Sequence, residues 1–214
     1  IDPVSGKRVG LETGDPRDFT CYEDLYEAFN KQLNFIVDTK VRVSNYIDRM
    51  FAKYAPAPFL SVVIEDCISK GRDYYDAGPR YNTNYIQCTG LGTTTDSLTV
   101  LKKHVFEDQT FSMERLLQVL SANFEGDEFL HQTVINKTPL FGNNDDYADD
   151  IAKCVYHDLL AAIDGKPNVR GGQFHLNMLS TTCHVYFGKI MGATPNGRLA
   201  HKSISDGTSP SHGA

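Results

Sequence analysis

Two short stretches of this chain have the pattern of a β-strand, and this small number constrains the fold. In residues 80–89, aromatic and β-branched residues alternate with asparagine. The second stretch covers residues 173–180 and resumes over 185–187. Two strands do not make an independently stable sheet. We therefore expect a helix-rich α/β chain whose partner strands lie in polypeptide outside these 214 residues.

The rest of the chain is mostly predicted helical. Thr20 and Glu23 have capping-box spacing and open a helix that the apolar pattern continues to about Tyr54. A mostly buried helix is predicted over residues 59–70, where Gly71 ends it. Further helices are predicted after a cap at Thr93, Thr94 or Thr95, after a cap at Ser112, over 127–136 and over 148–164.

Residues 188–214 are rich in Gly, Pro, Ser and Thr and have no apolar period. Structureless segments of this length are usually functional loops or linkers. Pro195-Asn196-Gly197 has the residue types of a defined turn, and Asp206-Gly207 is a second turn pattern. We therefore expect a specific loop in which Asp206 and Arg198 are structural. The segment stops without a capping element, so we also expect the chain to be an internal piece of a longer protein.

Composition excludes several classes of function. The net charge of −6 argues against a nucleic-acid surface, which needs clustered Lys and Arg. No apolar run approaches the roughly 20 residues that span a bilayer, and the first residues lack a signal-peptide pattern. The five cysteines are odd in number and lack C-x-x-C spacing, which favours reduced thiols and a cytoplasmic protein.

Gly90-x-Gly92 between a strand and a helix is half of a phosphate-binding fingerprint. The third glycine is missing, since position 95 is Thr, and no acidic residue ends a second strand. A tight turn for close helix packing is the favoured interpretation. A nucleotide-binding enzyme remains as an alternative hypothesis.

No metal site is predicted from the histidines or the acidic residues. The histidines that could ligate a metal lack recognisable spacing: His175, His184, His201 and His212. The acidic cluster fits the first turn of a helix better than a cation loop: Asp145, Asp146, Asp149 and Asp150. Cys183 and His184 would point to opposite faces of a strand, so a buried structural cysteine is favoured over a reactive pair.

Arg198 follows a rigid turn in a loop with few charges. A clamp anchored by a carboxylate or by backbone carbonyls is favoured over a substrate contact. In the second strand, Asn177, Leu179 and Thr181 would share one face, and Thr182 would lie on the other. Such a mixture of polar and apolar groups suits the lining of a barrel or pocket, or equally a sheet edge that faces solvent.

Three stretches together resemble the glycyl radical enzyme superfamily, the group of pyruvate formate-lyase and its dehydratase relatives. They are GLGTTTDSL at 90–98 with Lys102-Lys103 after it, FGNND at 141–145, and residues 188–213 with GATPNGRLA and SDGTSP. The three stretches occur in this order and together span most of residues 80–214. Residues 81–92 and 205–213 look closer to the dehydratase and lyase branch, including hydroxyproline, glycerol and propanediol dehydratases, than to pyruvate formate-lyase.

The resemblance implies a ten-stranded α/β barrel. On that pattern the chain is a single partial domain, in which residues 1–79 are mainly outer helices, 80–191 a strand–helix–strand part of the barrel, and 192–214 the signature loop. The resemblance also implies a radical-SAM activase that places a radical on a glycine. A cysteine thiyl radical then abstracts a substrate hydrogen, and water or another group leaves. It further implies a small-molecule substrate and a homodimer.

The sequence departs from the family pattern at both radical positions. No cysteine stands in a Gly-Cys-Val-Glu loop, and none of the 17 glycines stands in an Arg-Val-x-Gly-Tyr motif. We therefore expect no catalytic residue and no bound cofactor in this chain, which by itself would be inert. The expected pocket residues are Asn177, Leu179, Thr181 and Thr182, with the two threonines best placed to touch substrate. The alternatives are a pyruvate formate-lyase-type enzyme and a non-catalytic scaffold that binds a partner.

Overall fold

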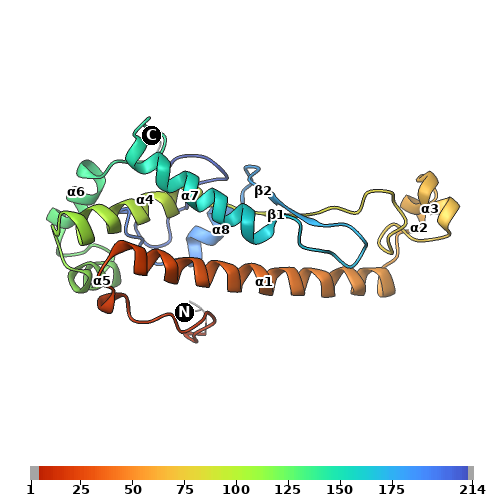
Figure 1. Cartoon of the computed structure of the whole chain (residues 1–214), viewed down its shortest axis with the longest axis horizontal. Coiled ribbons are helices and arrows are strands. Elements are labelled where there is room, and N and C mark those ends of the chain that lie inside the picture. Colours follow the sequence, from red (N-terminus) through yellow and green to blue (C-terminus); the bar gives the residue numbers. More distant parts are fainter. Residues whose placement is uncertain (1–4, 212–214) are drawn as a thin grey trace. The chain divides into compact units, whose positions relative to one another are not determined.

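The computed structural model describes residues 5–211, which divide into two units. Unit 1 comprises residues 5–32, 87–158 and 178–211. Unit 2 comprises residues 33–86 and 159–177. Helices α1 (Tyr22–Tyr54) and α7 (Asp146–Ile163) each contribute residues to both units (Figure 1).

Unit 1 is helical and carries the long C-terminal loop. Besides its parts of α1 and α7, its elements are η1 (Pro16–Asp18), α4 (Leu91–Val100), the π-helix η2 (Leu101–Glu107), α5 (Met113–Ser121), α6 (Glu128–Lys137) and α8 (Cys183–Ile190). Two N-caps explain where helices begin: Ser112 accepts the Arg115 N–H, and Asp127 accepts the Leu130 N–H. The predictions of helices after Ser112 and over 127–136 are confirmed.

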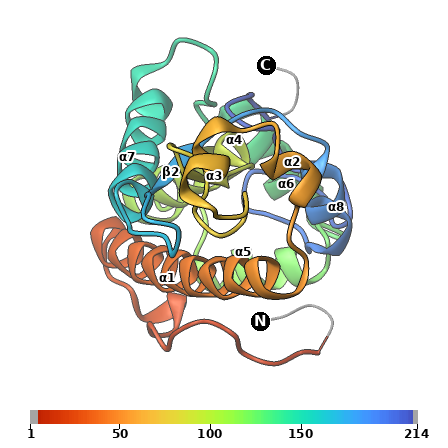
Figure 2. The ribbon, with the colours of Figure 1, turned by 90° about the vertical axis from the view of Figure 1, so that its right-hand side faces the viewer.

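Unit 2 contains the two strands. Its further elements are α2 (Pro58–Ser61), α3 (Glu65–Lys70), β1 (Asn84–Gln87) and β2 (Phe174–Asn177). The strands pair in a two-stranded sheet, of which only Gln87 belongs to unit 1. Helices α2 and α3 lie beside each other (Figure 2). Gly71, in the left-handed conformation, ends α3 as predicted.

The buried helix predicted over residues 59–70 is wrong. Two short helices replace it, with the extended residue Ile64 between them. Asp73 accepts the Ser61 hydroxyl at 2.7 Å and so fastens the end of the first helix. Apolar side chains of this segment are exposed, Phe59 to 91% and Val63 to 76%.

Both predicted strands are shorter in the structure, and the resumption over 185–187 is wrong because α8 covers those residues. Gly188 of α8 packs closely against the segment around Lys202. An added Cβ at Gly188 would lie 2.2 Å from the Lys202 carbonyl oxygen. The α/β class with many helices is confirmed, while the described part of the chain forms a two-stranded sheet rather than a barrel.

Each unit has its own apolar core. In unit 1, Leu116 of α5 and Leu130 of α6 are almost completely buried, together with Val100 and Val134. In unit 2, the core includes Phe174 of β2. Among residues 5–211 we found no helix with the length and apolar character needed to cross a bilayer.

The cap of α6 can be tested by substitution. We expect Asp127→Ala to lower the free energy of unfolding by about 1 kcal/mol, because the Leu130 N–H loses its acceptor. Urea denaturation measures this value. Asp150→Ala is the control, because Asp150 forms an exposed ion pair with Lys153, and such pairs contribute about 0–1 kcal/mol. Equal losses in the two variants would contradict the capping role.

Candidate functional site

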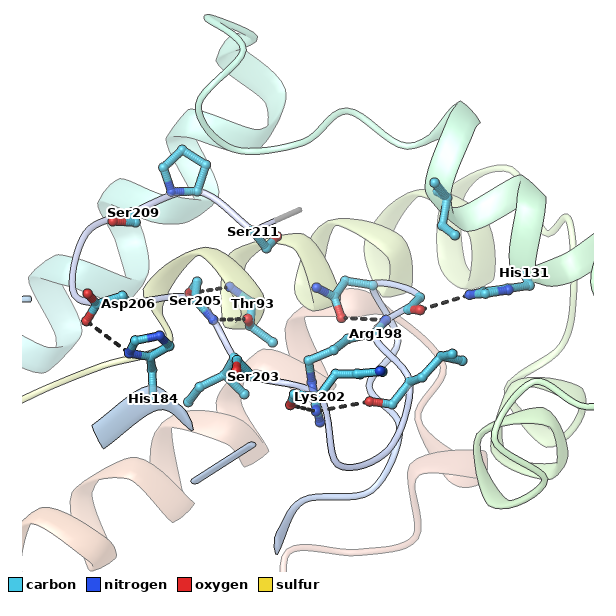
Figure 3. Close-up of a pocket in the computed structure, with 16 residues that line it drawn as sticks. Thr93, His131, His184, Arg198, Lys202, Ser203, Ser205, Asp206, Ser209 and Ser211 are labelled. Carbon is cyan, nitrogen blue, oxygen red and sulfur yellow. Dashed lines mark hydrogen bonds and ion pairs between the residues drawn. The ribbon is translucent and has the colours of Figure 1, made fainter. Parts of the chain in front are cut away.

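The C-terminal loop of unit 1, residues 191–211, lies against α4, α6 and α8 and surrounds a cavity of about 560 Å³ (Figure 3). Thr93 of α4, His131 of α6 and His184 of α8 contribute side chains to its lining. The other lining residues belong to the loop, apart from Ile135. We call residues 191–211 the C-terminal loop below.

The predicted turn at Pro195-Asn196-Gly197 is confirmed. The Gly197 N–H donates to the Thr194 carbonyl at 3.0 Å, and Gly197 has φ +88°. The Asn196 side chain is buried inside the turn and accepts the Thr194 hydroxyl at 2.7 Å. Its Oδ1 also accepts the Arg198 N–H at 3.4 Å. The turn is therefore held from within by a side chain.

Arg198 is a structural clamp, as its place after the turn suggested. Its side chain is 4% exposed and donates to backbone carbonyls of Lys202 at 2.6 Å, of Leu199 at 3.2 Å, and of Gly192. Its Nε donates to the Thr194 hydroxyl at 3.1 Å. All of these acceptors are neutral, and burial lowers the pKa of Arg198 below its usual value. The guanidinium thus holds together the part of the loop from Gly192 to Lys202.

Helix α6 and the turn before it hold the outer part of the C-terminal loop. His131 Nε2 lies 2.9 Å from the Gly197 carbonyl oxygen. Asn123 accepts the Ala200 N–H at 2.7 Å. Gly197 also approaches α6 closely, since an added Cβ would lie 2.8 Å from Ile135 Cγ1. These contacts fix the rim of the cavity.

The first turn of α4 holds the inner part. Gly90 takes the left-handed conformation and α4 begins at Leu91, so the prediction of a threonine cap at 93–95 is wrong. Thr93 instead forms a reciprocal pair with Ser205. The Thr93 N–H donates to the Ser205 hydroxyl at 3.0 Å, and the Ser205 N–H donates to the Thr93 hydroxyl at 2.8 Å.

Gly92 allows the loop to approach the helix. A Cβ at this position would lie 2.7 Å from the Ser209 carbonyl oxygen and 3.0 Å from the Ser211 nitrogen. The interpretation of Gly90-x-Gly92 as a turn for close packing is therefore confirmed. The Thr93 N–H, which a phosphate would need, is used by Ser205, so the nucleotide hypothesis loses its main support.

Asp96 is a fully buried carboxyl group on α4. Its Oδ1 accepts the Phe141 N–H at 2.9 Å, and its Oδ2 accepts the Ser211 hydroxyl. Burial raises the pKa of Asp96 to about 7. Asp96 therefore joins α4 both to the loop before α7 and to the end of the C-terminal loop.

The structure separates the predicted site residues into two groups. Arg198 and Asp206 line the cavity. The four predicted pocket residues lie outside its lining: Asn177, Leu179, Thr181 and Thr182. Asn177 ends β2, and the other three belong to the connection between β2 and α8.

The strand ends at Asn177 because side chains take the next backbone groups. The Gln87 amide donates to the Leu179 carbonyl, and the Thr181 N–H donates to Asp206 Oδ1 at 2.9 Å. Thr182 then adopts a helical conformation before α8. The strand alternation predicted for residues 177–182 is therefore wrong beyond Asn177.

The prediction of a buried Cys183 is also wrong, because Cys183 is exposed at the start of α8. His184 Nδ1 lies 2.7 Å from the Thr181 carbonyl oxygen. Within residues 5–211, no three His, Cys, Asp or Glu side chains gather as a metal site would require. His212 lies outside the described residues.

The acidic cluster before α7 behaves as a helix start, as favoured above. Asp146 begins the helix, and Asp149 lies in its first turn. Asp145 accepts the Tyr147 N–H at 3.0 Å. The sequence interpretation did not single out Thr93, Asp96 or Ser205 as anchors, although 90–98 was one of the stretches that carried the family resemblance.

The comparisons with known proteins identify the family. The model of the family described as "Pyruvate formate lyase-like" matches residues 1–188. The chain belongs to this family. Over 212 residues, 99% of the chain, it is 51% identical to trans-4-hydroxy-L-proline dehydratase of Clostridioides difficile, of which it covers 27%. It is 36% identical over 211 residues to isethionate sulfite-lyase of Nitratidesulfovibrio vulgaris, covering 96% of the chain and 25% of that protein.

A solved structure also matches the fold of this chain. The crystal structure of the Clostridioides difficile hydroxyproline dehydratase with trans-4-hydroxy-L-proline bound matches 98% of the chain and 26% of that protein with a TM-score of 0.93 at 51% identity. The resemblance to the dehydratase and lyase branch is thus confirmed. The chain spans about a quarter of the length of the curated relatives it matches.

Close packing at Gly92 predicts a loss of stability in Gly92→Ala. Alanine favours a helix over glycine by about 0.5–1 kcal/mol, whereas overpacking against backbone costs about 1–3 kcal/mol. We therefore expect a lower free energy of unfolding in urea. Gly192→Ala is the matched control, because nothing lies within 4 Å of its added Cβ. A Gly92→Ala variant as stable as the control would show that the loop yields easily.

Buried Asp96 predicts a pH dependence. Between about pH 4, near the usual aspartate pKa, and pH 7, the folded chain holds a proton that the unfolded chain has lost. The free energy of unfolding should therefore fall as pH rises through this range and then level off.

Asp96→Asn, which stays neutral, should remove this fall, so its stability relative to the wild type should rise from about pH 4 to pH 7. Urea denaturation across this range measures the difference. Ser211→Ala keeps the carboxyl group and should keep the slope. Parallel profiles for Asp96→Asn and the wild type would contradict the assignment.

Proposed function

We propose that the protein containing this chain is a glycyl radical dehydratase that removes water from a small hydroxylated substrate. The observation that supports this most is the similarity across nearly the whole chain to trans-4-hydroxy-L-proline dehydratase, at higher identity than to isethionate sulfite-lyase. Dehydration of trans-4-hydroxy-L-proline is therefore the favoured reaction, with elimination of another leaving group second.

In this proposal the chain contributes part of a barrel wall. Strands β1 and β2 are two of the ten barrel strands, residues 1–79 supply mainly outer helices, and residues 192–214 supply the signature loop. The agreement of the fold with a substrate-bound dehydratase supports this arrangement. A barrel excludes water and side reactions from a reactive intermediate.

The chain itself holds neither radical position of the family pattern, since its cysteines and glycines lack the flanking motifs. It therefore performs no step of the radical chemistry and acts by shaping the site. The remaining parts of the proposal are a radical-SAM activase as partner, a homodimer and a cytoplasmic location, all of which follow from the family resemblance.

We assign the substrate-facing role to the connection after β2. Asn177 and Thr181 are half-buried, and Leu179 is 65% exposed in this chain. Asn177 ends a strand of the proposed barrel, and the other side chains, including that of Thr182, follow directly after it. A mixture of hydroxyl, amide and apolar groups suits a pocket for a small polar substrate.

The proposal is tested on the full-length protein encoded around this segment. Anaerobic activation should give the electron paramagnetic resonance doublet of a glycyl radical, followed by turnover of trans-4-hydroxy-L-proline and not of isethionate. Turnover of isethionate instead would replace the substrate assignment. A reading frame without the cysteine and glycine motifs would favour the non-catalytic scaffold.

The pocket assignment predicts the effect of Thr181→Val. This change keeps the volume and removes the hydroxyl, so kcat/KM should fall about tenfold if the substrate loses a hydrogen bond of about 1.4 kcal/mol. Steady-state kinetics of the activated protein measure this. Thr182→Val tests the second threonine. Thr208→Val, at an exposed loop position, is the control and should leave kcat/KM unchanged.

A further inference from the structure

The connection between β2 and α8, residues 178–182, has no regular secondary structure of its own. Its position therefore depends on contacts with other parts of unit 1. The Gln87 amide holds the Leu179 carbonyl, and the Asp206 carboxylate accepts the Thr181 N–H at 2.9 Å. Asp206 thus binds the backbone of one of the two threonines that the proposed function places at the substrate.

Asp206 is itself held firmly. The Ser209 N–H donates to its carbonyl at 2.6 Å, which closes a tight turn. His184 Nδ1 lies 3.6 Å from Asp206 Oδ1 (Figure 3). The same nitrogen lies 2.7 Å from the Thr181 carbonyl oxygen. Asp206 and His184 therefore contact the N–H and the carbonyl of the same residue.

The next residue brings the two backbones into contact. Gly207 has φ +46°, which favours glycine. A Cβ there would lie 2.6 Å from the Met178 carbonyl oxygen and 3.1 Å from Ser180 Oγ. The Asp206-Gly207 turn thus contacts the connection along most of its length, and no side chain fits between them.

The turn also has a rigid support behind it. Ser205 precedes Asp206 and is fixed to the first turn of α4 by its reciprocal pair with Thr93. The Thr89 hydroxyl donates to the Ser205 carbonyl at 3.1 Å. A displacement of Asp206 would therefore break contacts on both sides.

We propose that Asp206 is a positioning residue for the substrate pocket: its carboxylate sets the place of Thr181 through the backbone N–H. This inference rests on the proposed function. The backbone of Thr181 is thus held by the C-terminal loop and by α8 rather than by strand pairing. In this role Asp206 affects substrate binding through Thr181 and takes no part in the reaction.

The test uses the activated full-length protein and the substrate trans-4-hydroxy-L-proline. Asp206→Ala should raise KM at least about tenfold and change kcat by less than about threefold. The reason is that the lost interaction stabilises the bound substrate and the transition state equally. Asp206→Asn keeps an amide oxygen that can accept the Thr181 N–H, so it should restore KM to within about threefold of the wild type. The radical doublet should keep its wild-type intensity in both variants.

Asp127→Ala is the matched control. Asp127 also accepts one backbone N–H in unit 1, that of Leu130, and pairs with Arg115. Neither of these partners belongs to the connection after β2, so the loss of Asp127 should reduce stability and leave KM unchanged. If Asp206→Ala does not fold, Asp206→Glu replaces it, since the longer carboxylate keeps the charge and displaces Thr181, which should again raise KM.

The outcomes separate the two proposals. A doublet and turnover in the wild type with an unchanged KM in Asp206→Ala, or in Asp206→Glu as its replacement, would overturn the positioning role alone. An equal rise of KM in Asp127→Ala would also overturn it, since general loss of stability would then explain the effect. Absence of the doublet in the wild type would overturn the proposed function and this inference with it.

Discussion

The contact between the first turn of α4 and the C-terminal loop holds the candidate site of unit 1 in place. Thr93 and Ser205 satisfy each other's backbone and side-chain groups, and Gly92 lets the loop backbone come close. Because Ser205 is fixed, the following turn at Asp206 can reach the connection after β2. One helix end thereby determines the path of chain more than a hundred residues away.

Buried polar groups give this contact its specificity. Arg198 donates to neutral oxygens of the loop, and Asp96 accepts from Phe141 and Ser211. A buried polar group without partners is costly, so each of these side chains disfavours other loop paths that would leave it unsatisfied. The same burial raises the pKa of Asp96 to about 7, so the stability that this anchor of the loop contributes depends on pH.

Much of the local structure could be predicted from the sequence. The helix to Tyr54, the cap at Ser112, the helix over 127–136 and the turn at 195–197 follow from short patterns that act within one or two turns. The errors lie where distant contacts compete with those patterns. The threonines after Gly92 are inside a helix, and the strand stops at Asn177 because Asp206 and Gln87 take the next backbone groups.

The sequence alone determined the family, because the three spaced motifs can be recognised without knowledge of their contacts. It also determined most of the helices, although residues 185–187, predicted as a strand, belong to α8. It also named Arg198 and Asp206 as structural. Only the tertiary structure decided what they hold: carbonyls of the loop for Arg198, and the Thr181 N–H for Asp206. The physical reason is that the hydrogen bond between Asp206 and Thr181 joins residues 25 positions apart and depends on the path of the chain between them, which no local pattern encodes. The acceptors of Arg198 are near in sequence, but which of them the guanidinium meets depends on how the loop folds.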